Sequence, residues 1–213
     1  MAYRRARERM IQEQLVSRGI NDPRVLRAMA KVPRHLFLES ELWGQAYEDH
    51  PLPIGSSQTI SQPYMVALMA EALQLKGAER VLEVGTGSGY AAAVLGELSA
   101  EVFTVEAVEE LALKARSLLN SLGYRNVSVL VGDGTLGWEE HAPYDAVIIS
   151  AAAPCIPRPL LEQLKAPGYL VFPMGEKELQ TLVRIRKDQA GIREEYLGEC
   201  QFVKLRGRYG WED

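Results

Sequence analysis

The clearest chemical signal in the chain is a run of three alternate glycines with small hydroxyl residues between them. The run reads Gly85, Thr86, Gly87, Ser88 and Gly89. An apolar segment, 81–84, precedes it, and a helix-forming stretch begins near Tyr90. Glycines at such points let the backbone turn sharply and approach a ligand, while the free amides at the start of a helix attract an anionic group. The pattern predicts a loop that binds a nucleotide-type cofactor.

The spacing of these glycines distinguishes a dinucleotide from other nucleotide-type cofactors. A dinucleotide fingerprint reads G-x-G-x-x-G, whereas this chain has G-x-G-x-G with Glu83 two positions before the first glycine. The arrangement resembles motif I of the S-adenosylmethionine-dependent methyltransferases. Glu83 ends a predicted strand beneath the loop, where its carboxylate would hold loop amides or reach the sulfonium side of the cofactor through water.

Two further acidic residues follow the next two predicted strands. Glu106 ends one strand, and Asp133 with Gly134 follows the other. In a doubly wound sheet, ligands lie across the carboxyl ends of the strands, so Glu106 is expected to take the ribose hydroxyls and Asp133 the adenine amino group. The alternatives are an ordinary acid at a helix N-terminus for Glu106 and a plain Asp-Gly turn for Asp133.

Strands and helices that alternate along the chain must position these residues. Strands are expected at 81–84, 101–105, 127–131, 145–150 and 169–172, and helices at 90–98, 109–122 and 160–164. Such alternation predicts an α/β fold, a doubly wound and mostly parallel sheet of the Rossmann-like methyltransferase type. Segments 180–186 and 193–205 are expected to add a C-terminal antiparallel strand pair at a sheet edge.

We expect one methyltransferase domain over residues 1–213, in three parts. Residues 1–78 would form an N-terminal helical cap and an active-site loop, 79–175 the cofactor-binding core, and 176–213 the C-terminal strands. Asn21, Asp22 and Pro23 predict the start of a helix within the cap. Residues 46–63 are rich in Pro, Gly, Ser, Thr and Gln, and this composition predicts a loop.

Several short segments, taken in order, point to one family. They are Thr59-Ile60-Ser61-Gln62-Pro63 before the glycine run and, after it, Gly132-Asp133-Gly134, Ala151-Ala152-Ala153-Pro154 and the stretch 168–175. Together they resemble the protein-L-isoaspartate (D-aspartate) O-methyltransferases, over about residues 10–175. Two residues depart from the family's pattern. Tyr64 replaces the family's usual His, and Lys204 replaces the usual Pro of Val-Pro-Leu.

The resemblance implies transfer of a methyl group from S-adenosylmethionine to the free carboxylate of L-isoaspartyl and D-aspartyl residues, leaving S-adenosylhomocysteine. The methyl ester would collapse to a succinimide, which gives protein repair. Ser61 would orient the carboxylate, which is ionised at neutral pH and needs no general base. Gln58, Thr59 and Tyr64 would line the same site. The alternative for Ser61 is a helix N-cap before Pro63.

Composition limits the partners. The 213 residues are 47% hydrophobic and carry a formal net charge of −4, so we expect no nucleic-acid or membrane partner. The N-terminus lacks an apolar signal segment, which favours a cytoplasmic protein, and we expect a monomer that acts on isoaspartyl peptides and proteins.

Cys155 and Cys200 have no His or Cys at the spacing of metal ligands, so no metal is expected, and both thiols are interpreted as buried or incidental. Of the histidines, His141 is placed on a solvated turn and His50 near the cleft or in a structural role.

Three other functions remain open from the sequence. A methyltransferase of the same fold could act on a small molecule, but it would need a metal triad or a general base. A nicotinamide-dependent oxidoreductase would need the longer glycine spacing. A cofactor-binding module without catalysis would bind the cofactor and methylate no peptide.

Overall fold

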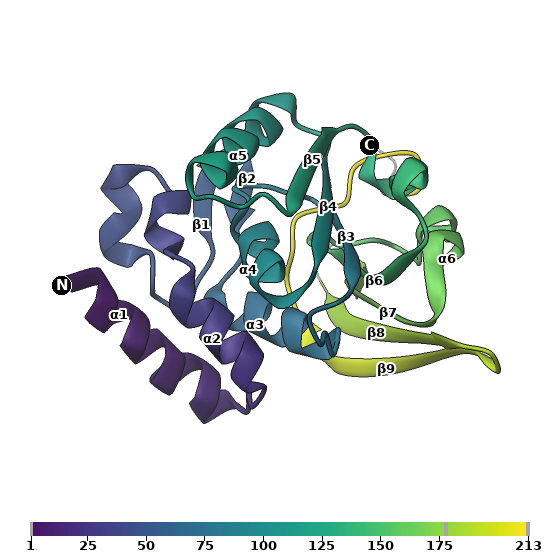
Figure 1. The fold of residues 1–213 in the computed structure, drawn as a ribbon, viewed down its shortest axis with the longest axis horizontal. Coiled ribbons are helices and arrows are strands. Elements are labelled where there is room, and N and C mark those ends of the chain that lie inside the picture. Colours follow the sequence, from purple (N-terminus) through teal and green to yellow (C-terminus); the bar gives the residue numbers. More distant parts are fainter. Residues whose placement is uncertain (1, 177–178, 212–213) are drawn as a thin grey trace.

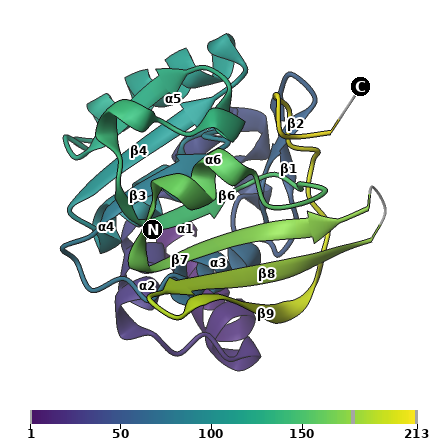
Figure 2. The same cartoon turned by 90° about the vertical axis from the view of Figure 1, so that its right-hand side faces the viewer.

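The computed structural model describes residues 2–176 and 179–211. A seven-stranded sheet with the order β5-β4-β3-β6-β7-β8-β9 runs through the molecule, and β1 and β2 form a separate pair (Figures 1 and 2). The large sheet contains β3 (Arg80–Val84), β4 (Glu101–Glu106), β5 (Val127–Val131), β6 (Tyr144–Ile149), β7 (Leu164–Gly175), β8 (Gln180–Asp188) and β9 (Gly191–Cys200). Strands β3 to β7 pair in parallel, and β8 and β9 continue the sheet antiparallel. The predicted fold class is confirmed.

The two faces of the sheet are covered differently, as the alternation of strand side chains requires. Val81 and Val102 pack in one core with side chains from the N-terminal helices and α4, while Leu82 and Phe103 face a second core that includes Leu160 of α6. The helices are α1 (Ala2–Met10), α2 (Pro23–Lys31), α3 (Pro63–Ala72), α4 (Tyr90–Leu98), α5 (Glu109–Ser121) and α6 (Arg158–Gln163). Across the described residues, no helix has the length and apolarity needed to cross a membrane.

The N-terminal segment covers one face of the sheet through helices whose starts follow from local chemistry. Asp22 caps α2 by accepting a hydrogen bond from the Arg24 amide at 2.7 Å, with Pro23 at the first helical position. The predicted helix start at Asn21, Asp22 and Pro23 is confirmed. Beyond Met10 the chain continues as a short π-helical segment, Ile11–Leu15, and a 3-10 turn, Val16–Arg18.

The prediction of a loop over residues 46–63 was wrong in part. This segment contains a small antiparallel hairpin, β1 (Leu52–Gly55) and β2 (Gln58–Ile60), in which Leu52 pairs with Ile60. Both of these side chains are buried. The turn between the strands uses Ser56 and Ser57 with positive φ angles of 49° and 56°. The polar composition of residues 46–63 therefore reflects the turn of the hairpin, while the buried side chains of Leu52 and Ile60 pack the hairpin against the core.

The C-terminal strand prediction also needs correction. Strand β9 ends at Cys200, so residues 201–205 do not belong to the sheet edge. The chain instead crosses back over the carboxyl ends of the parallel strands, and Lys204 forms an isolated parallel bridge with Ala152. We call residues 202–211 the C-terminal strap.

Candidate active site

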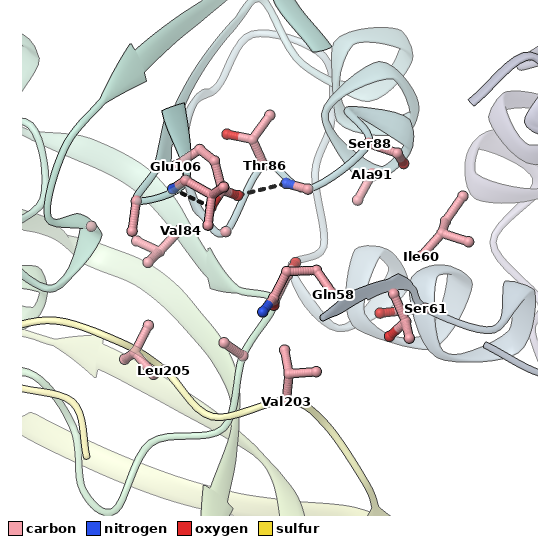
Figure 3. A pocket seen from close by; sticks show the side chains of 18 of the residues that line it. Gln58, Ile60, Ser61, Val84, Thr86, Ser88, Ala91, Glu106, Val203 and Leu205 are labelled. Atoms are coloured by element: carbon pink, nitrogen blue, oxygen red, sulfur yellow. Dashed lines mark hydrogen bonds between the residues drawn. The ribbon is translucent and has the colours of Figure 1, made fainter. Parts of the chain in front are cut away.

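A cleft lies at the carboxyl ends of β3, β4 and β6. Four segments provide most of its walls: β2 with the residues that follow it, the glycine loop after β3, the end of β4, and the strap (Figure 3). It holds about 940 Å³ of space between protein atoms, part of it open to solvent.

The glycine loop adopts a conformation that explains its three glycines. Gly85, Gly87 and Gly89 have φ angles of 91°, 53° and 87°, values that side-chain-bearing residues rarely adopt. A Cβ at Gly89 would also lie 3.2 Å from the Ala115 side chain of α5. The loop ends at Tyr90, where α4 begins and aims its free amides at the cleft. Thr86 and Ser88 line the cleft with Gly85 and Gly87.

Glu106, the last residue of β4, lies against this loop. Its Oε2 atom accepts a hydrogen bond from the Gly87 amide at 2.8 Å, and its Oε1 atom accepts one from the Val108 amide at 3.0 Å (Figure 3). The side chain lines the cleft although the residue is only 7% exposed. Each carboxylate oxygen keeps a further lone pair, so Glu106 can shape the loop and still accept from ligand hydroxyls.

Glu83 lies beneath the loop, outside the cleft lining. It is fully buried, and its Oε2 atom accepts a hydrogen bond from the Thr104 hydroxyl at 2.6 Å. The Thr104 hydroxyl is also 2.7 Å from the Thr86 hydroxyl, which links Glu83 to the cleft wall. Burial raises the pKa of Glu83 to about 8, with a smaller contribution from the charge on Glu106, while the bond from Thr104 acts in the opposite direction.

Ser61 and its neighbours Gln58 and Thr59 line the cleft on the side of the hairpin. Ser61 and Gln58 are labelled in Figure 3, which shows them facing the glycine loop across the cleft. The residue at the N-cap of α3 is Gln62, without a side-chain capping bond, so Ser61 is not the N-cap. Within the described part of the chain, no protein group bonds to the Ser61 hydroxyl.

Asp133, which was expected to contact the adenine amino group, is not among the residues that line the cleft. Its carboxylate accepts hydrogen bonds from the Thr135 amide at 2.9 Å, the Thr135 hydroxyl at 2.6 Å and the Arg208 amide at 2.8 Å. Asp133 thus caps a 3-10 turn, Gly134–Leu136, and anchors the strap. Its neighbour Gly134 does line the cleft, and a Cβ there would lie only 2.5 Å from the Val84 side chain.

Tyr64 is also outside the cleft lining, so this structure does not place it where the family's usual His was expected to make a contact. It is the second residue of α3, and the Arg18 guanidinium carbon lies 3.5 Å from its ring centroid. This cation–π contact ties the ring to the N-terminal segment. Sequence alone did not reveal this partner, because Arg18 is far from Tyr64 in the chain.

The strap, whose residues 202–205 were expected in the last strand of the sheet edge, forms one wall of the cleft. Val203, Lys204, Leu205 and Arg206 line the cleft. The Ala152 amide donates to Val203 O at 2.8 Å, and the Leu205 amide donates to Ala152 O at 2.8 Å.

The remaining candidate residues lie away from this chemistry. His50 is half-buried and bonds to Glu48. His141 ends the 3-10 turn Glu139–His141, where it is half-buried and its ring stacks on Phe103 at a centroid distance of 4.3 Å. Cys155 is exposed rather than buried, and Cys200 is half-buried. Over residues 2–176 and 179–211, no group of three or more His, Cys, Asp or Glu side chains could hold a metal ion.

The cleft fits a cofactor of the S-adenosylmethionine type. The glycine loop presents backbone amides at the start of α4, and Glu106 offers carboxylate oxygens at the end of the neighbouring strand. Apolar walls from Val84, Ile148 and Leu205 can cover a flat base.

Comparison with known proteins agrees with this site. The family model for protein-L-isoaspartate(D-aspartate) O-methyltransferase (PCMT) matches residues 5–210. Relatives named protein-L-isoaspartate O-methyltransferase include one from Geobacter metallireducens, 57% identical over 208 residues that cover 97% of this chain and 96% of the relative. Another, from Syntrophus aciditrophicus, is 53% identical over 212 residues and covers 98% of this chain and 97% of the relative.

Solved structures lead to the same family. A protein-L-isoaspartate O-methyltransferase superposes with a TM-score of 0.87 at 30% identity, over 96% of this chain and 67% of its own. A Plasmodium falciparum protein named as a beta-aspartate methyltransferase (PCMT), in complex with S-adenosyl-L-homocysteine, has a TM-score of 0.80 at 26% identity, over 94% and 98% of the two chains. The chain therefore belongs to the protein-L-isoaspartate(D-aspartate) O-methyltransferase family.

Proposed function

We propose that this protein is a repair enzyme that methylates the free carboxylate of L-isoaspartyl and D-aspartyl residues in damaged peptides and proteins. The observation that carries the proposal is the shared cleft, in which Ser61 faces the glycine loop and Glu106. Family membership supplies the reaction, and the cleft supplies a place where a carboxylate and the cofactor meet.

The glycine loop and Glu106 would hold the cofactor. When bound, S-adenosylmethionine supplies a methyl group activated by a positively charged sulfur. We assign the ribose hydroxyls to Glu106, because its carboxylate lies at the end of β4 within the cleft lining. Thr86 and Ser88 add hydroxyl groups on the same wall, while Glu83 supports the loop from below through Thr104.

Ser61 would orient the substrate carboxylate. A peptide carboxylate is ionised near neutral pH, so the chain has no proton to remove before the methyl transfer. The Ser61 hydroxyl can donate one hydrogen bond and leave the second carboxylate oxygen free to react. Orientation of this kind is worth roughly 7–11 kcal/mol of the barrier in well-aligned reactions, and the apolar walls Ile60 and Val203 help to exclude water.

The strap would bind the peptide backbone of the substrate. The backbone bonds of the strap to Ala152 use Val203 O and the Leu205 amide, which lie on either side of Lys204. In the described structure, the amide and carbonyl of Lys204 itself form no hydrogen bond. An extended peptide could pair with these groups, a mode of recognition that depends on backbone more than on side chains and therefore suits many substrates.

The alternative functions account less well for the cleft. A nicotinamide-dependent enzyme would need the longer glycine spacing, and the family match stands against it. A small-molecule methyltransferase would need a base to activate its substrate, yet none of the three histidines is among the cleft residues. A module without catalysis would not need the Ser61 hydroxyl in the cleft.

We also propose that the enzyme acts as a monomer, since one chain provides all the walls of the cleft. Light scattering in solution tests this oligomeric state.

The proposed function is tested with two synthetic peptides that differ only in one aspartyl or isoaspartyl linkage. Transfer of labelled methyl from S-adenosylmethionine to each is measured with the purified full chain. We expect label in the isoaspartyl peptide and background label in the aspartyl peptide. Equal labelling of both, or cofactor binding without labelling of either, would rule the proposal out.

A further inference from the structure

The strap carries a row of basic side chains at alternate positions: Lys204, Arg206 and Arg208. Lys204 and Arg206 lie in the extended part of the strap, where alternate residues face the same side, whereas Arg208 lies in the turn formed by residues 207–210. The intervening residues Val203 and Leu205 pack toward the second core, and Leu205 is only 3% exposed. Lys204 is half-buried and Arg206 is exposed, and both line the cleft. The strap therefore presents cations where the substrate peptide would lie.

Residues 2–176 and 179–211 provide no ion-pair partner for these cations. Over the described residues, none of the three forms an ion pair. Two nearby carboxylates are already engaged: Asp133 accepts bonds from Thr135 and from the strap backbone, and Glu106 accepts bonds from the glycine loop and the Val108 amide.

Trp211 helps to fix the first of these cations. Its indole N–H donates to Ala152 O at 2.9 Å, and the Lys204 ammonium lies 5.8 Å from its ring centroid. A cation at this distance from a tryptophan ring is attracted to it. Gly207 also packs against Asp133, since a Cβ there would lie 2.0 Å from Oδ1 of that carboxylate. Both contacts hold the basic row against the cleft.

From this arrangement we propose that Lys204 and Arg206 make the enzyme selective for isoaspartyl peptides that carry a second carboxylate two positions from the damaged residue. The inference rests on the proposed function and refines its substrate class. A peptide paired with the backbone of Lys204 would place its alternate side chains beside the two cations, as opposite charges lie across neighbouring strands. The chain as a whole has a net charge of −4, so a preference for acidic peptides would arise locally at the strap.

The test uses two isoaspartyl peptides that differ only by Glu or Gln two positions from the isoaspartyl residue. For the wild-type chain we expect KM for the Glu peptide to be about three- to tenfold lower at low salt, with kcat within about twofold, because exposed ion pairs contribute little each and are screened. At roughly 1 M salt the two KM values should converge. In Lys204→Gln combined with Arg206→Gln, the KM ratio should approach one.

Lys76→Gln combined with Arg125→Gln is the matched control, since both residues are exposed and outside the cleft lining, and the loss of two cations changes the net charge equally. This variant should keep the wild-type KM ratio. Equal KM values for both peptides with the wild-type chain would overturn the inference while leaving the proposed function standing. A lower KM for the Glu peptide that survives the double substitution would also overturn the inference. Failure to label either peptide would instead count against the proposed function.

Discussion

At the scale of single residues, the proposed chemistry depends most on the Ser61 hydroxyl. Ser61→Ala should lower kcat roughly 10- to 100-fold, which corresponds to the loss of one hydrogen bond to a charged group. Affinity for S-adenosylhomocysteine, measured by calorimetry, should change little. Ser128→Ala, at an exposed position on β5, serves as the control and should keep full activity. An alanine variant at position 61 with wild-type kcat would remove Ser61 from the mechanism.

Glu83 predicts a pH dependence of stability. Its ordinary pKa is 4.5, and burial raises it to about 8 in the folded protein. Between these values the folded state keeps a proton that the unfolded chain has released, so this group lowers stability as pH rises, by at most about 1.4 kcal/mol per pH unit. Glu83→Gln should therefore gain stability relative to wild type between pH 5 and pH 8.

Denaturant unfolding at several pH values measures this difference. Glu109→Gln, an exposed acid at the start of α5, is the control and should follow the wild-type curve. A constant difference between Glu83→Gln and wild type across this pH range would show that Glu83 does not carry the titration.

At the scale of elements, the attachment of the strap can be tested through two glycines with similar backbone angles. Gly207 has a φ of 128° and packs against Asp133, whereas Gly198 on β9 has a φ of 133° and nothing within 4 Å of its added Cβ. Both alanine variants carry the backbone strain, but only Gly207→Ala also displaces Asp133. We expect KM for the isoaspartyl peptide to rise about tenfold more in Gly207→Ala, because the substitution would displace the strap that we propose binds the substrate. Equal KM values in the two variants would show that the strap does not contribute to substrate binding.

The elements show which features the sequence could predict. The parallel core followed from strong local signals: apolar strands, the glycine run and capped helices. The hairpin at 52–60 was missed because only Leu52 and Ile60 mark it as buried, within a polar turn. The attachment of the strap to Asp133 was missed for another reason. Asp133 bonds to Arg208, 75 positions along the chain, and no local pattern encodes so distant a contact.

At the scale of the whole molecule, cofactor binding should stabilise the fold, because the cleft joins the hairpin, the sheet and the strap. A ligand that binds only the folded state at about 100 times its Kd adds roughly 2.7 kcal/mol to the free energy of unfolding. S-adenosylhomocysteine should therefore raise Tm of the wild-type chain. The rise should be smaller at the same concentration in Glu106→Gln, which lacks the carboxylate charge at the ribose position. An identical rise in both proteins would contradict the role assigned to Glu106.

The central claim is repair, and the most direct measurement follows the isomers of one peptide over time. An isoaspartyl peptide is incubated with the wild-type chain and S-adenosylmethionine, and the isoaspartyl, succinimide and aspartyl forms are separated by chromatography. We predict that the isoaspartyl form declines while succinimide and then the normal aspartyl form accumulate, and that none of this occurs without the cofactor. An isoaspartyl peptide that stays unchanged, or that gains methyl groups without any aspartyl form appearing, would contradict the account.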